Sequence, residues 1–98
     1  MLRITIEEKD DFIRFRLEGK LIGDWVKELE RAWICAKNAN PGARFKIDLR
    51  GVTFVDEKGK GLLESMVSEG AELVADNPMM TSLVRSIVEH VKVEHANT

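Results

Sequence analysis

The sequence predicts one α/β domain built on a mixed β-sheet, with an N-terminal antiparallel hairpin, later parallel strands and helices packed against them. Two observations predict this class: apolar and polar residues alternate over the first part of the chain, and segments of helical spacing then alternate with short apolar runs. A chain of 98 residues with 44% hydrophobic content is long enough for one core and too short for two. The predicted domain therefore spans residues 1–98.

The hairpin is predicted from a period of two. Leu2, Ile4 and Ile6 alternate with polar residues, and after a charged turn at residues 9–11 the alternation resumes at Phe12 or Ile13 and continues to Leu17. Arg14 and Arg16 occupy the intervening positions of the second strand. We expect these arginines to face solvent on a sheet with one wet face.

A first helix is expected from about residue 24 to residue 38. Asp24 is the candidate N-cap, and Asn40, Pro41 and Gly42 end the helix. Cys35 is expected to be a small apolar packing residue. The stripe that should face the sheet consists of Ile22, Val26, Leu29, Trp33 and Ala36.

A central strand at residues 44–55 leads almost directly into a second helix at residues 57–69, which Gly70 ends. Asp56 is the expected N-cap of this helix, and Glu57 is favourable at the positive end of the helix dipole. A short strand at residues 72–75, a third helix at residues 79–90 and a last short strand through Val91 and Val93 complete the prediction.

Composition excludes several classes of protein. The net charge of −2, from 15 basic and 17 acidic residues, gives no reason to expect nonspecific binding to nucleic acid or to anionic membranes. One cysteine excludes an internal disulfide. No apolar run has the length of a signal peptide or the roughly 20 residues of a membrane span, so we expect a cytoplasmic protein without membrane insertion.

The chain also lacks the motifs of catalysis and cofactor binding. No serine or cysteine lies in a nucleophile elbow, and the phosphate-loop motif GxxxxGK[ST] is absent. The spacing of His90 and His95 does not specify a metal site. We therefore expect no enzyme activity, no cofactor and no metal.

The turn Asp56, Glu57, Lys58, Gly59, followed by Lys60 and Gly61, has two interpretations. It is either an ordinary strand-to-helix turn with an acidic cap, or a recognition surface where glycines allow a partner's backbone to approach closely. We predict partner binding through all six residues.

The segment LRGVTFVDEKGKGLL, residues 49–63, resembles the signature of STAS domains, the family of anti-sigma factor antagonists and sulfate-transporter tails. LEGKLIGDWVKELERA (17–32) and GAELVADNP (70–78) are also similar to STAS segments. The resemblance implies a STAS-like fold, and a protein partner such as an anti-sigma factor of the kinase-like type. The family's signature places a phosphorylatable serine or threonine where this chain has Glu57, so regulation without serine phosphorylation is expected. Thr53, Ser65 and Ser68 carry the other hydroxyls near the turn, and they are the alternative sites for phosphorylation.

Two other functions stay open. A STAS-like chain can be the subunit of a transporter or another assembly, or a homodimer with a structural role. A small-ligand or nucleotide sensor is the third hypothesis, although Asp56 and Glu57 would repel an anion at the start of the second helix. Many STAS domains end in a further helix that this prediction lacks, so we expect an uncovered surface. Met79 and Met80 are expected to extend the interaction surface if they are exposed.

Overall fold

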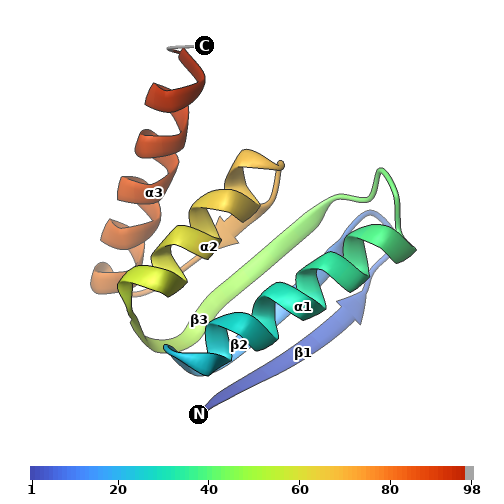
Figure 1. Ribbon diagram of the computed structural model, residues 1–98, viewed down its shortest axis with the longest axis horizontal. Coiled ribbons are helices and arrows are strands. Elements are labelled where there is room, and N and C mark those ends of the chain that lie inside the picture. Colours follow the sequence, from blue (N-terminus) through green and yellow to red (C-terminus); the bar gives the residue numbers. More distant parts are fainter. Residues whose placement is uncertain (97–98) are drawn as a thin grey trace.

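The computed structural model describes residues 1–96. Its four strands and three helices follow the chain in the order β1 (Leu2–Glu8), β2 (Ile13–Leu21), α1 (Asp24–Ala39), β3 (Phe45–Val55), α2 (Glu57–Ser68), β4 (Glu72–Val74) and α3 (Pro78–Ala96) (Figure 1).

The sheet has the strand order β1-β2-β3-β4. β1 and β2 form the expected antiparallel hairpin, in which Ile4 lies opposite Leu17. β3 pairs with β2 in parallel, and β4 pairs with β3 in parallel. Each parallel pair is joined through a helix, because parallel strands need a long crossover. The predicted mixed sheet is therefore confirmed.

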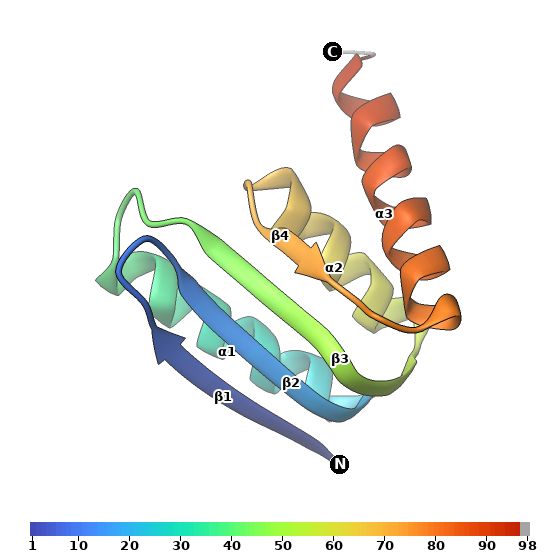
Figure 2. The same ribbon diagram turned by 180° about the vertical axis from the view of Figure 1, so that it is seen from behind.

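The helices lie on one side of this sheet. α1 and α2 pack against the same face, and α3 lies beside α2 (Figure 1). The view from behind shows the other face of the sheet without any helix of the described chain in front of it (Figure 2). One face of the sheet is thus packed and the other is open.

The core lies between the sheet and the helices. Phe15, Trp33 and Phe45 form an edge-to-face aromatic cluster, with 4.8 Å between the ring centroids of Trp33 and Phe45. The largest side chains with almost no exposed surface are Phe15, Leu17, Leu21, Leu29, Ile47, Leu49, Leu63, Met66 and Ile87. Because they come from two central strands and all three helices, the core joins every layer of the domain.

The last strand predicted at Val91 and Val93 is wrong. The chain there continues α3 to Ala96. Val91 lies four residues after Ile87 and is buried with it, so it extends the helical stripe, whereas Val93 is exposed. No glycine or proline follows Pro78 to end the helix. Two valines around one lysine were not enough to define a strand.

Two smaller expectations at α1 also need correction. Cys35 is exposed, so it is not a core packing residue. Asp24 is not the N-cap: the cap position is Gly23, at φ +54°, and no side chain caps the helix. Asp24 is instead the first helical residue, where its negative charge interacts favourably with the positive end of the helix dipole.

Candidate partner-binding site

Asp56 forms the structural centre of the turn between β3 and α2. It is the N-cap of α2, with extended backbone, and its Oδ1 accepts a 2.7 Å hydrogen bond from the Gly59 N–H. Its Oδ2 accepts a 2.9 Å bond from the N–H of Gly23, 33 residues earlier in the chain. One carboxylate therefore caps α2 and ties the beginning of α1 to it.

These two amides also change the acidity of Asp56. The backbone N–H of Gly23, and after it that of Gly59, hold the pKa of the Asp56 carboxyl below its usual value, because both hydrogen bonds favour the charged form. The nearby charge of Lys58 acts in the same direction. Asp56 is thus kept as a carboxylate at neutral pH, and its oxygens are committed to the chain's own backbone.

Gly59 is buried inside the turn. A Cβ at this position would lie 2.7 Å from the carbonyl oxygen of Leu21 and 3.0 Å from the side chains of Leu21 and Val55. The backbone that comes close to Gly59 is therefore that of β2 in the same molecule. A contact between Gly59 and a partner stays a prediction, whereas the fold itself requires a glycine at this position.

The remaining residues of the turn face outward to different extents. Glu57 and Lys58 are exposed, and Lys60 is half-buried. Gly61 is exposed, and a Cβ added to it would meet no other atom within 4 Å. The accessible part of the predicted site consequently carries one negative and one positive side chain that are exposed, the partly exposed Lys60, and open backbone at Gly61.

The structure adds a neighbour that the sequence did not identify. Because Asp56 holds Gly23, the start of α1 lies at the start of α2, and Trp25 in the first turn of α1 is 37% exposed. An exposed tryptophan is a frequent anchor of protein interfaces. The sequence predicts a turn at the glycine before Trp25. It does not predict the hydrogen bond from Gly23 to Asp56, because that bond depends on the three-dimensional fold.

An apolar groove lies where β3 ends and α3 begins. It has a volume of about 180 Å³ and is lined by Phe54, Val55, Met79, Met80 and Leu83. Phe54 is 53% exposed and Met79 is 59% exposed, while Met80 is buried. One of the two methionines thus extends the exposed surface and the other packs in the core.

The other candidate groups are not part of the Asp56–Gly61 turn. Thr53 is exposed, with its hydroxyl 3.4 Å from the Gly19 carbonyl, and Ser65 and Ser68 are exposed on α2. His90 joins two helices: its Nδ1 is 2.7 Å from Glu64 on α2, and its Nε2 is 3.2 Å from Glu94 on α3.

Two further observations concern membranes and metals. Among the described residues, no three His, Cys, Asp or Glu side chains are arranged to hold a metal ion. The side chain of His95 lies outside the part that the structure describes. No helix within residues 1–96 has the length and apolar character needed to cross a membrane.

Comparison by sequence finds no relative: no protein-family model matches the chain, and no curated protein matches it either. Comparison by structure finds proteins with a similar fold. An anti-sigma factor antagonist from Mycobacterium paratuberculosis superimposes with a TM-score of 0.72 at 21% identity, covering 88% of this chain and 82% of that one. The anti-sigma factor antagonist SpoIIAA in its unphosphorylated form gives 0.64 at 20% identity, covering 83% and 80%.

A third solved structure agrees with these two. An uncharacterised protein of the DUF3478 family with a SpoIIAA-like fold, from Shewanella loihica PV-4, gives a TM-score of 0.56 at 16% identity and covers 81% of this chain and 71% of its own. The chain therefore has the SpoIIAA-like fold, which is the fold of STAS domains that the signature at residues 49–63 predicts.

Proposed function

We propose that this protein is a non-enzymatic regulator that acts in the cytoplasm by binding a protein partner. The contact is made by the exposed part of the Asp56–Gly61 turn and by the outer face of α2. The partner we expect is an anti-sigma factor of the kinase-like type, because two proteins of the same fold are anti-sigma factor antagonists.

The observation that carries this proposal is the division of the turn. Asp56 and Gly59 fix its backbone against β2 and α1, while Glu57 and Lys58 are exposed. A rigid frame that presents charged side chains binds with a small loss of conformational entropy.

The turn supports constant binding rather than a phosphorylation switch. It contains no hydroxyl, and Glu57 stands at the position where the STAS signature has a serine or threonine. A serine phosphate carries about −1.5 to −2 charges, whereas a glutamate carries one, and Lys58 partly offsets it. Glu57 is therefore a weak phosphate mimic whose charge no kinase adds and no phosphatase removes.

An exchange of the two charges tests the contact. The double variant Glu57→Lys with Lys58→Glu keeps composition and net charge but reverses the local pattern. The matched control exchanges Glu30 and Arg31, which are adjacent and exposed on α1. In a pulldown from the native cell, the wild type and the control should capture the same kinase-like protein, identified by mass spectrometry, and the Glu57/Lys58 exchange should lose it. Equal capture by all three proteins contradicts the proposed contact.

A second experiment tests the absence of a switch. The protein is incubated with the captured kinase and ATP, and any phosphate is mapped by mass spectrometry. We expect none. Phosphate on Thr53 or Ser65 would show that another hydroxyl has taken over the switch.

The apolar groove favours a second candidate function, that of a subunit in a larger assembly such as a transporter. Phe54 and Met79 expose apolar surface beside each other, and such surface is commonly covered in permanent complexes. Transporter components in the pulldown, with capture that is lost in Met79→Glu and retained in the Glu57/Lys58 exchange, would favour this function over the first.

A further inference from the structure

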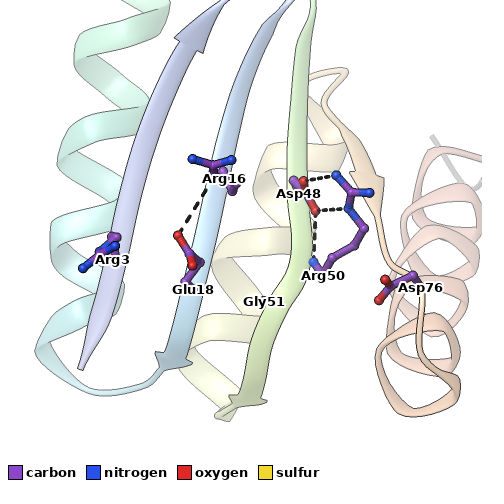
Figure 3. A pocket seen from close by; sticks show the side chains of 7 residues that line it. All are labelled: Arg3, Arg16, Glu18, Asp48, Arg50, Gly51 and Asp76. Atoms are coloured by element: carbon purple, nitrogen blue, oxygen red, sulfur yellow. Dashed lines mark hydrogen bonds and ion pairs between the residues drawn. The ribbon is translucent and has the colours of Figure 1, made fainter.

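The open face of the sheet contains a broad depression of about 510 Å³. It is lined by Arg3, Arg16, Glu18, Asp48, Arg50, Gly51 and Asp76, which come from β1, β2, β3 and the loop after β4 (Figure 3). Three of these residues, Arg3, Arg16 and Arg50, carry guanidinium groups and lie on three adjacent strands. No residue of the Asp56–Gly61 turn takes part, so this surface is separate from the proposed partner contact.

An irregularity in β3 forms the floor of the depression. Arg16 pairs with Asp48 and Glu18 pairs with Gly51, so β3 takes three steps where β2 takes two. Such a bulge bends the strand and redirects side chains, and bulges are frequent next to functional sites. At Gly51 a Cβ would lie 2.9 Å from Cγ of Glu18 and 3.1 Å from the carbonyl oxygen of Leu17. A side chain at this position would therefore press on Glu18 and on the backbone of β2, and glycine leaves this space open.

Asp48 holds one of the three guanidinium groups in place. It is the one buried charged residue within the described chain, with 2% of its surface exposed. Its carboxylate accepts bonds from Nε (3.0 Å), Nη2 (2.8 Å) and the backbone N–H (3.0 Å) of Arg50. Hydrogen bonds from the Arg50 side chain hold the pKa of Asp48 below its usual value, although burial opposes them.

Asp48 thereby fixes Arg50 without using all of its donors. A guanidinium group has five N–H donors, and the fork to Asp48 leaves the other edge without a hydrogen bond to any residue that the structure describes, on the side where Asp76 lies (Figure 3). The Asp48 side chain is buried and loses hydration, whereas the Arg50 side chain is 51% exposed, so the ion pair offsets the cost of burying the carboxylate rather than adding much net stability. The arrangement has a clear use if Arg50 is pre-oriented to receive a second oxyanion beside Asp48.

The other two arginines have weaker partners. Arg16 lies 4.0 Å from Glu18, and both side chains are close to half exposed. Within the described part of the chain no carboxylate lies within ion-pair distance of Arg3. Asp76 and Glu18 supply acceptors at the sides of the depression. They oppose a bare polyanion and suit a ligand that brings its own hydrogen-bond donors beside one anionic group.

We propose that this depression is a second binding site, for a small molecule that carries a phosphate or carboxylate group. Arg3, Arg16 and Arg50 bind the oxyanion, Gly51 provides the space below it, and Glu18 and Asp76 accept hydrogen bonds from hydroxyl or amino groups of the same ligand. Planar guanidinium groups match both oxyanions, because each can accept two parallel hydrogen bonds.

Titration followed by NMR tests the site on the whole protein. Inorganic phosphate and malonate are added separately at matched ionic strength, with sodium chloride as the reference. We expect saturable shifts of the backbone amides of Arg16, Arg50 and Gly51, with a Kd on the order of 1 mM. Saturation by phosphate alone identifies a phosphorylated ligand, and saturation by malonate alone identifies a carboxylate. No saturation by either anion up to roughly 50 mM overturns the proposal.

Variants distinguish a built site from general charge attraction. Arg3→Ala and Arg16→Ala should each weaken binding about tenfold, since each removes charged hydrogen bonds from exposed positions. Arg50→Lys keeps the charge but loses the fork, and it should weaken binding to a similar extent while the protein stays folded. Arg31→Ala on α1 removes the same charge elsewhere and should have no effect. Equal weakening by Arg31→Ala and Arg16→Ala would show screening only and would contradict the site.

Discussion

The inward and the outward residues of the Asp56–Gly61 turn differ in what they contact. Asp56 and Gly59 are engaged by the molecule itself, through the amides of Gly23 and Gly59 and the carbonyl of Leu21. Glu57 and Lys58 are exposed. The first and last of these four positions thus form a frame, and the two between them form a presented surface. Stability and binding should respond to different substitutions.

The largest effect on stability is expected from Gly59→Ala. The added Cβ would lie 2.7 Å from the Leu21 carbonyl, which is backbone and cannot rotate away. The strain should lower the free energy of unfolding by about 1–3 kcal/mol, which urea denaturation measures. Partner capture per folded molecule should be unchanged. A variant as stable as the wild type would show that β2 and α2 can separate at this point.

Asp56→Asn should have a smaller effect, and that effect should depend on pH. The amide can cap α2 but cannot accept from Gly23 and Gly59 with equal strength. The folded pKa of Asp56 lies below its ordinary value of 3.8, so the carboxylate stabilises the native state above that value. This contribution is lost as the pH falls through the folded pKa.

The measurement is urea unfolding of the wild type and Asp56→Asn from about pH 7 to about pH 2. The difference between the two proteins should be constant near neutrality and shrink in acid. Asp48 and Glu69 also have lowered pKa values, from the hydrogen bonds of Arg50 and Lys37, but both proteins retain them and their effects cancel in the difference. A difference that grows in acid would contradict the assigned role of Asp56.

Gly61→Ala should act in the opposite direction from Gly59→Ala. Gly61 lies within α2 with open space around it, so alanine removes the entropic cost of glycine without a clash. The free energy of unfolding should rise by about 0.5–1 kcal/mol. If a partner's backbone approaches Gly61, capture should weaken at the same time. Higher stability with unchanged capture would remove Gly61 from the contact and leave Glu57 and Lys58.

Local features of this turn were predictable from sequence, and distant ones were not. The cap by Asp56 depends on residues three positions apart, so its pattern is visible in the chain. The bond from Gly23 to Asp56 depends on how two crossovers bring separate helix ends together.

The open sheet face shows the same limit. Arg16 was predicted to face solvent from its place in an alternating strand, and it is exposed. The burial of Asp48 was not predicted, because it results from a bulge between two strands that are distant in sequence and from the guanidinium of Arg50 above it. The strand predicted at Val91 is wrong for a different reason: a pair of valines fits both a strand and a helix, and Val91 is buried four residues after Ile87 on the same helix, as helical spacing requires.

The smallest effect on stability and the largest effect on binding are expected from the exchange of Glu57 and Lys58. Both side chains are exposed, so the free energy of unfolding should change by no more than about 0.5 kcal/mol. Glutamate at the first position of α2 interacts favourably with the helix dipole, so the exchange should lower the free energy of unfolding slightly. Partner affinity, measured by calorimetry once the partner is purified, should fall at least about tenfold. A variant that loses stability as Gly59→Ala does would place these charges in the frame, and the division of the turn into two parts would then be wrong.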